Sequence, residues 1–342
     1  MLREFKSITQ LQKTFPDEQS CIEYFRDLRW PDGVKCVHCA ATKVYSLSTG
    51  GFKCAACLKK FTVRNGTIFE DSKLPLATWF HAIFVLISNP KGVSSMELHR
   101  QLGITQKSAW FVVQRIRNLM IANAPKQILT GTVEIDEMYV GGKERWKHRN
   151  KKTKGAQGFG SYAAKTGVLG MIERGGDLRI EKILYGTPAM LKRHVRRHVA
   201  NGSVIQTDEA RSYKWMREHY THETVNHRLN EYVRDDVTTN SLEGAFGHFK
   251  RSVTGVYHKV SDAHINRYLS AFAWRWNRKQ LSTGARTEGL LKVASFLQPS
   301  YPFMPIKRAY VKRRPAANFS NDSVRAPVLN CLRFQRHANA LK

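Results

Sequence analysis

The chain has 342 residues, of which 42% are hydrophobic, and its formal net charge is +29. That length and composition suffice for two or three domains with buried cores, which excludes a disordered chain. So large a positive charge argues against a protein that handles neutral ligands, and it favours a polyanionic partner, most simply nucleic acid. An anionic membrane is the rival partner. However, the longest apolar run, residues 76–87, is too short to span a bilayer and contains His81.

A cysteine pattern dominates the first part of the chain, after a short helix predicted over residues 15–30. Four of the six cysteines form two Cys-x-x-Cys pairs: Cys36, Cys39, Cys54 and Cys57. Two matched pairs at this spacing are typical of a zinc ribbon, in which four thiolates bind one structural Zn²⁺. The residues between the pairs, 43–53, suit a β-hairpin. A redox dithiol is the alternative, and the neighbouring lysines leave DNA contact or pure structural support open for the ribbon.

The next region reads as helical and contains a candidate DNA-binding motif. One helix is expected over residues 76–87, and a second begins near Ser94 and ends before Gly103. Thr105 then caps a third helix that extends to about Met120. This pattern predicts a helix-turn-helix whose recognition helix opens with Gln106, Lys107 and Ser108, with an ordinary helical hairpin as the alternative.

The rest of the chain alternates strands and helices. Strands are expected at residues 133–140, 167–172, 178–184, 203–208 and 222–227, with helices at 187–199, 238–250 and around 265–276. Three strands, a helix, a strand ending in an acid, a short strand and a further helix match the order of an α/β RNase H-like (retroviral-integrase-like) catalytic domain. In that fold, acids from the first strand, the fourth strand and the late helix converge at one end of the sheet.

Those positions are occupied here by Asp136, Asp208 and Glu243. Three carboxylates suit Mg²⁺ or Mn²⁺, and two such ions about 3.5–4 Å apart commonly support phosphoryl transfer on DNA. Glu243 and Lys250 lie seven residues apart, almost two helical turns, so they share one face of the 238–250 helix. Taken singly, each acid could instead be a salt-bridge partner of a basic neighbour.

The chain resembles the bacterial insertion-sequence transposases of the ISXO type, which carry an N-terminal zinc ribbon, and also the related Merlin transposases. The resemblance spans roughly residues 15–278. It is carried by FPDEQSCIEYFRDLRWPDGVKCVHC, FTVRNGTIFEDSKLPL, EIDEMYVGGKE, TDEARSY, VNH, TTNSLEGAFGHFKR and GVYHKVSDAHINRYLSAFAWRWNR.

The resemblance implies a DNA strand-transfer enzyme with an Asp, Asp, Asn-or-Glu, Lys signature on Asp136, Asp208 and Lys250. Its third position is ambiguous, because the chain offers both Asn240 and Glu243. Helix geometry favours Glu243 as the metal ligand, since Asn240 is rotated by about 80° from Lys250. Lys250 would contact a phosphate. Lys143 and Arg251 are further candidates for DNA contact. A role near the site is possible for His227 and His258.

The sequence therefore predicts a DDE-type transposase that binds terminal inverted repeats, cleaves DNA and joins it to a target. The alternatives are a non-catalytic zinc-ribbon regulator or domesticated transposase, and an RNase H-like nuclease without strand transfer. The predicted regions are residues 1–73 (ribbon), 74–124 (helix-turn-helix), 130–298 (catalytic) and 299–342 (basic tail). Expected partners are double-stranded DNA and a second copy of the chain, at least as a homodimer, with no membrane. A bacterial cytoplasmic, nucleoid-associated protein is expected.

Overall fold

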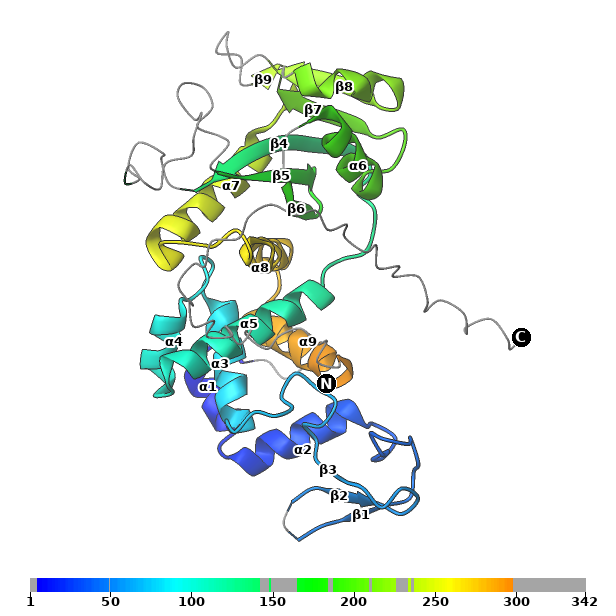
Figure 1. Cartoon of the computed structure of the whole chain (residues 1–342), viewed down its shortest axis with the longest axis vertical. Coiled ribbons are helices and arrows are strands. Elements are labelled where there is room, and N and C mark those ends of the chain that lie inside the picture. The colour runs from blue at the N-terminus through cyan, green and yellow to red at the C-terminus, as the bar shows by residue number, and fades with distance from the viewer. Residues whose placement is uncertain are drawn as a thin grey trace, which may run out of the picture. The chain divides into compact units, whose positions relative to one another are not determined.

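The computed structural model describes residues 5–48, 50–141, 148, 165–183, 187–208, 211–225, 233–234 and 237–297. These residues build a helical region, a small ribbon and a mixed sheet covered by helices (Figure 1). The predicted basic tail, residues 299–342, lies outside the described residues. None of the described helices combines the length and the apolar composition that a membrane span needs.

The helical region is organised around α3 (Leu76–Ser88), which is buried on nearly every side. The helices packed with it are α1 (Ile8–Thr14), α2 (Glu18–Arg29), α4 (Ser95–Leu102), α5 (Gln106–Ala122) and α9 (Thr283–Phe296). Local signals set several helix ends. Asp17 closes a capping box at the start of α2, and Ser94 and Thr105 each cap the following helix through a side-chain oxygen. The predicted starts of the second and third of these helices are confirmed, and the helix predicted over residues 15–30 begins at Glu18.

The ribbon consists of β1 (Val44–Ser46), β2 (Phe52–Cys54) and β3 (Lys60–Phe61), paired antiparallel in that order. β1 and β2 form the hairpin expected between the two cysteine pairs. Its core is small, with Cys36, Cys54 and Phe61 as the buried apolar residues. Such a core is too small to hold a fold alone, so the ribbon depends on its metal.

The sheet has five strands in the order β6-β5-β4-β7-β8. Their bounds are β4 Thr132–Val140, β5 Thr166–Glu173, β6 Leu178–Ile183, β7 Val204–Asp208 and β8 Thr221–Val225. β5 pairs antiparallel with both β4 and β6, whereas β7 and β8 run parallel to β4. All five strands match predicted strands to within a few residues.

Helices cover both faces of this sheet. On one face, α6 (Pro188–His198) and the 3₁₀ helix η4 (Arg211–Glu218) pack on Val133, Ile135 and Leu169. On the other face, α7 (Asn240–Ser252) and α8 (Ile265–Asn277) pack on Met138 and Val168. The helix predicted at residues 238–250 is confirmed as α7, and its Leu242, Phe246 and Phe249 are all buried there.

Two helices were not expected from the sequence, and one of them shows that the end of the predicted catalytic region packs into the helical core. α1 precedes the predicted first helix, and α9 follows α8. α9 lies within residues 130–298, the range predicted for the catalytic region, yet its Leu290, Leu291 and Ala294 join the helical core around α3. The face of α8 that carries Ala271 and Trp274 joins the same core. Residues distant in sequence thus complete the helical region.

Candidate active site and zinc site

The alternation of β4 sorts its side chains between the two sheet faces. Val133 and Ile135 enter the core under α6, whereas Glu134 and Asp136 lie on the α7 face. The parallel register with β7 pairs Glu134 with Gln206. Two residues further along each strand stand Asp136 and Asp208, so the two aspartates lie side by side at the end where β7 stops.

Charged groups on α7 interact electrostatically with Asp136. Burial raises the pKa of Asp136 to about 6, from an ordinary value of 3.8, although the N–H of Glu137 donates to its Oδ1 at 2.7 Å. The charges of Asp208 and Glu243 raise this pKa further, and the ammonium of Lys250 lowers it. The structure therefore brings four predicted site residues into one electrostatic cluster.

Glu134 fixes the start of α7 against the sheet. Its carboxylate is 0% exposed, and one oxygen accepts the N–H of Leu242 at 3.0 Å. The N-cap residue of α7, Thr239, makes no side-chain capping bond, so a strand residue satisfies a helix N–H group from outside. Glu134 therefore acts as a buried cap for α7 at Leu242, the residue directly before Glu243.

Gln206 adds a second tie at the same end of α7. This side chain is 2% exposed, and its Oε1 accepts from Arg174 at 2.9 Å and from the N–H of Thr238 at 3.2 Å. Its Nε2 donates to Glu223 on β8 at 3.0 Å. Thr238 ends β10 (Val237–Thr238), the second strand of a hairpin with β9 (Val233–Arg234) that leads into α7. Both buried polar groups thus position the segment that carries Glu243.

Gly170 allows α7 to approach the sheet closely. It is the cross-strand partner of Asp136, and a Cβ at this position would lie 2.6 Å from Phe246 Cζ and 2.7 Å from Leu242 Cδ1. Real side chains do not tolerate such separations, so any larger residue would push α7 outward. The absence of a side chain beside Asp136 therefore sets the distance between the aspartates and Glu243.

Gly170→Ala is expected to impair both stability and activity, because Leu242 and Phe246 must move to admit the methyl group. We expect a loss of about 1–3 kcal/mol in unfolding free energy, typical of overpacking, and a loss of about 100-fold in turnover from misplaced α7 residues. Denaturant unfolding and a DNA cleavage assay measure the two effects. Gly289→Ala is the matched control, since nothing lies within 4 Å of its Cβ, and it should stabilise α9 by up to about 1 kcal/mol. If Gly170→Ala cleaved DNA at the wild-type rate, the close approach of α7 to the sheet would not be required for activity.

The other predicted site residues fall into different environments. Asn240 is the exposed first residue of α7, and its N–H donates to Thr238 Oγ1 at 3.1 Å. Glu243 and Lys250 are exposed on the same helix, with Thr239 Oγ1 donating to Glu243 at 3.3 Å. Arg251 is exposed and lies over Gly247. Lys143 and His227 lie outside the described residues.

His258 follows a π-helical turn, Val253–Tyr257, that continues α7. It is exposed, and its backbone has φ 56° and ψ −44°, a left-handed conformation that is uncommon for residues other than glycine. Its Nδ1 lies 3.1 Å from the carbonyl oxygen of Thr254. Strained residues and π-helical turns often occur near functional sites, so His258 remains a candidate.

A second acid with a raised pKa, half-buried, lies on the opposite face of β4. Burial raises the pKa of Glu137 to about 7, and the hydroxyl of Tyr213 donates to its Oε1 at 2.8 Å. The charges of Asp136 and Asp208 raise this pKa as well. Tyr213 is 1% exposed and belongs to the core beneath α6. Glu137 therefore supports the strand from behind, whereas Asp136 faces α7.

The acidic cluster fits divalent cations by its chemistry. Its donors are carboxylate oxygens, which suit Mg²⁺ and Mn²⁺, and the charge they concentrate calls for a cation. Within the described residues, however, the carboxylates of Asp136, Asp208 and Glu243 do not all lie within 4.8 Å of one another. Two ions about 3.5–4 Å apart would accommodate this wider spacing, because outer ligands of different ions need not be close.

The four predicted zinc ligands do come together. The sulfur atoms of Cys36, Cys39, Cys54 and Cys57 all lie within 4.8 Å of one another. Cys36 Sγ is 3.7 Å from Cys57 Sγ, and Cys39 Sγ is 3.5 Å from Cys54 Sγ. A tetrahedron with Zn–S bonds of about 2.3 Å requires sulfur separations of roughly 3.8 Å, so the cluster fits Zn²⁺. Backbone N–H groups of His38 and Cys57 donate to the first sulfur of each pair, at 3.4 and 3.5 Å. The prediction of a structural zinc site is confirmed.

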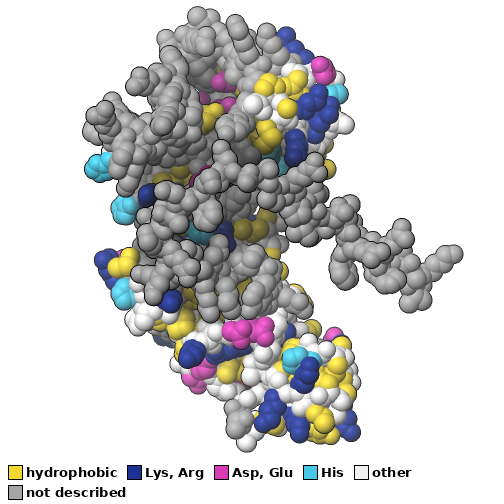
Figure 2. Space-filling view, viewed as in Figure 1, with side chains coloured by type: hydrophobic (Ala, Val, Ile, Leu, Met, Phe, Trp, Pro, Cys, Tyr) yellow, Lys and Arg dark blue, Asp and Glu magenta, His cyan; other side chains and the backbone are white. Residues whose placement is uncertain are grey.

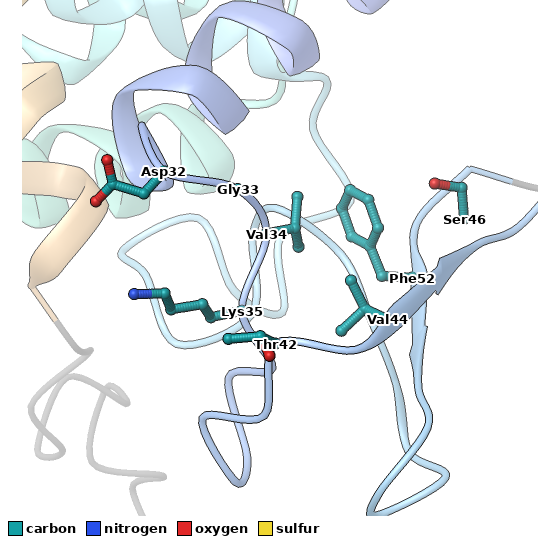
Figure 3. Close-up of a pocket in the computed structure, with 8 residues that line it drawn as sticks. All are labelled: Asp32, Gly33, Val34, Lys35, Thr42, Val44, Ser46 and Phe52. Atoms are coloured by element: carbon teal, nitrogen blue, oxygen red, sulfur yellow. The ribbon is translucent and has the colours of Figure 1, made fainter.

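A cavity of about 290 Å³ lies on the ribbon, away from the acidic cluster. Val34, Val44 and Phe52 line one part of it, and Asp32 and Lys35 lie toward the other (Figure 3). Its lining contains one carboxylate and one ammonium group but no cysteine or histidine. This cavity therefore has the character of a surface hollow and not of a reaction centre.

The predicted DNA-contacting residues of the helical region lie at the start of α5. α4 ends at Gly103, whose φ of 64° forms a left-handed C-cap, and Thr105 begins the next helix. Gln106 and Lys107 are exposed, and Ser108 is half-buried. Gln106 Nε2 donates to Ser95 at 3.1 Å, which joins the two helices. A short turn with a fixed glycine thus presents a basic and a polar side chain at the first turn of α5.

Comparison with known proteins identifies two domains in the chain. Residues 16–60 match the family model of a transposase zinc-ribbon domain, and residues 128–277 match that of the ISXO2-like transposase domain. The matched ranges contain the four cysteines and Asp136, Asp208, Glu243 and Lys250. The chain thus contains a transposase zinc-ribbon domain followed by an ISXO2-like transposase domain. It is 29% identical over 277 residues to an uncharacterized protein in transposable element ISH50 of Halobacterium salinarum, an alignment that covers 77% of this chain and 92% of that protein.

Proposed function

We propose that the protein is a DDE-type DNA transposase that binds the ends of its element, cleaves them and joins them to target DNA in a metal-dependent reaction. The observation that carries the proposal is the cluster of Asp136, Asp208 and Glu243. Two strands and a helix contribute these residues, and the charges of Asp208 and Glu243 raise the pKa of Asp136. A carboxylate with a perturbed pKa that lies near acids from distant segments is typical of reaction centres.

The sheet supports an RNase H-like assignment for the catalytic region, proposed to span residues 130–298. The strand order β6-β5-β4-β7-β8, with β5 as the antiparallel neighbour of β4, is the order expected for that fold. Asp136 lies on the central strand, and Asp208 ends its parallel neighbour. Because parallel strands end at the same edge of a sheet, this arrangement places both aspartates where α7 can complete the site.

In the proposed mechanism, the protein's own residues prepare the site. Asp136, Asp208 and Glu243 would hold two divalent cations, which would activate the attacking oxygen and stabilise the leaving oxygen. Glu134 and Gly170 set the position of α7, and hence of Glu243. The ammonium of Lys250, which already lowers the pKa of Asp136, would contact the phosphate beside the reacting bond. Water would supply the first nucleophile and a 3′-hydroxyl group the second.

The helical region supports a proposed helix-turn-helix that would recognise the terminal repeats. α4 and α5 are joined by a short turn, and Gln106 and Lys107 are exposed at the start of the second helix. Lys250 and Arg251 on α7 would contact the DNA being processed. We further propose that the protein acts as a dimer or larger assembly, because two element ends must be paired.

The identity of the third metal ligand can be tested with two substitutions. We expect Glu243→Gln to reduce Mg²⁺-dependent cleavage by at least about 100-fold, because a neutral amide is a poor ligand for a hard cation. Asn240→Ala should have a smaller effect, since Asn240 would orient DNA or water without being the ligand. Both variants should bind terminal-repeat DNA like the wild type. The reverse order of cleavage losses would make Asn240 the third ligand.

The proposed function is tested by incubating the full chain with a duplex that carries the inverted repeats flanking its gene. A transposase should nick this duplex only with Mg²⁺ or Mn²⁺ and then join the end to a second duplex. Nicking without joining would identify a nuclease, and binding without nicking would identify a regulator.

A further inference from the structure

The exposed side of α6 carries a dense group of arginines. Arg193, Arg196 and Arg197 are all exposed, and their spacing of three and four residues places them on one side of the helix. Leu191 and Val195 occupy the opposite side and are buried against the sheet. α6 therefore divides into an apolar face and a strongly cationic face.

The 3₁₀ helix η4 extends this cationic surface. Lys192 Nζ lies 3.6 Å from Glu218 and 5.6 Å from the ring centre of Trp215, and Arg196 hydrogen-bonds His219 at the end of η4. These contacts place η4 beside α6. Arg217 is also exposed on η4, and we define the α6 arginine face as Arg193, Arg196 and Arg197.

Neighbouring acids in the described part of the chain leave most of this charge uncompensated. Glu218 is paired with Lys192, and its side chain is 65% exposed. Glu181 is occupied by the imidazoles of His194 and His198, each 2.8 Å away, which lower its pKa to about 2. Close positive charges repel one another and destabilise the folded chain, so their accumulation on one helix requires a reason beyond solubility.

The position of the face separates it from the proposed active site. α6 and η4 cover the sheet face formed by Val133 and Ile135, whereas Asp136 lies on the α7 face. In Figure 2, dark-blue Lys and Arg side chains gather over the part of the molecule where Figure 1 places α6. DNA on the arginine face would therefore be separated from the scissile phosphate by the thickness of the sheet.

We propose that the α6 arginine face binds the phosphate backbone of double-stranded DNA, at a surface distinct from both the helix-turn-helix and the acidic cluster. Guanidinium groups pair with phosphate oxygens in a bidentate manner, and exposed arginines along one helix side suit a duplex backbone without reading its sequence. This inference rests on the proposed transposase function. It assigns the surface to DNA that is not being cut at that moment, such as the target or the flank of an end.

The test removes three charges from the face and compares salt dependence. In the full chain, Arg193→Gln, Arg196→Gln and Arg197→Gln are combined, with a Lys6→Gln, Lys13→Gln, Lys91→Gln variant as the control for total charge. All three control lysines are exposed, and they belong to the segments around α1 and between α3 and α4. Affinity for a short duplex without terminal repeats is measured over a range of salt concentrations. The plot of log K against log salt has a negative slope, and each lost phosphate contact reduces the steepness of that slope by about 0.9. The slope of the arginine variant should therefore be less steep than that of the wild type by about 2 to 3.

The outcomes separate this inference from the proposed function. The inference is supported if the slope is less steep in the arginine variant than in the control. The arginine variant should also nick terminal-repeat DNA at the wild-type rate and keep the wild-type melting temperature. The inference is overturned if the two variants have equal slopes. Absence of nicking by the wild type would instead contradict the transposase proposal, while the difference in slope would still report on the arginine face.

Discussion

Asp136→Asn is expected to abolish metal-dependent cleavage and, at the same time, to stabilise the metal-free protein. The first effect follows from loss of a carboxylate at the centre of the acidic cluster, and should exceed about 1,000-fold. The second follows from the pKa of Asp136, which burial and the neighbouring acids raise from 3.8 to about 6. Keeping this group ionised near pH 7 costs about 3 kcal/mol, and the neutral amide avoids that cost.

The pH dependence has a definite sign. The folded chain holds the Asp136 proton more tightly than the unfolded chain, so this group's contribution to stability falls as pH rises from about 4 to about 6. Above pH 6 the penalty is complete, and bound Mg²⁺ should relieve it. Melting temperatures measured against pH, with and without Mg²⁺, should show this dependence in the wild type. In Asp136→Asn it should be weaker, with the part due to Glu137 remaining. Retained cleavage, or an identical pH dependence, would contradict the assignment.

Loss of zinc is expected to unfold the ribbon while the helical core survives. Cys54→Ser removes a fully buried ligand, and the ribbon's own apolar core is limited to a few residues. In small zinc domains, metal binding supplies an apparent free energy of about 10–16 kcal/mol, most of which is folding free energy. The helices around α3 bury many large side chains of their own and do not depend on this ion.

Hydrogen exchange and zinc content measure this effect together. Amides of β1 to β3 should lose protection in Cys54→Ser, and bound zinc should fall to none. Cys21→Ser is the matched control, because Cys21 is buried in the helical core and is not part of the cysteine cluster. The control should keep its zinc and its protected ribbon. A native ribbon in Cys54→Ser would show that the hydrophobic contacts suffice without the metal.

Local patterns predicted much of the fold and of the candidate site. The strand expected at residues 133–140 became β4, and helical spacing placed Glu243 and Lys250 together on the exposed part of α7. The capping residues Ser94 and Thr105 placed two helix starts to within about a residue. These features succeed because each depends on neighbours within a few residues along the chain.

The features that the sequence did not reveal depend on contacts between distant segments. Gly170 is informative only once Phe246 is known to lie against it, and a lone glycine in a strand gives no sign of that contact. Glu134 looked like one of several acids, because its bond to Leu242 joins residues 108 positions apart. α9 was missed because its buried surface is matched by α3, which precedes it by about 200 residues. Tertiary packing determines all three.

Metal rescue of Asp136→Cys tests the central claim most directly. A thiolate is a poor ligand for Mg²⁺ and a better one for softer cations, so replacing the carboxylate should change the metal requirement if Asp136 binds the ion. The measurement is nicking of terminal-repeat DNA by the wild type and by Asp136→Cys, with Mg²⁺ and with Mn²⁺. We expect the variant to be inactive with Mg²⁺ and to regain activity with Mn²⁺, whereas the wild type should nick with both. Nicking by Asp136→Cys at the wild-type rate with Mg²⁺ would contradict a metal-binding role for Asp136.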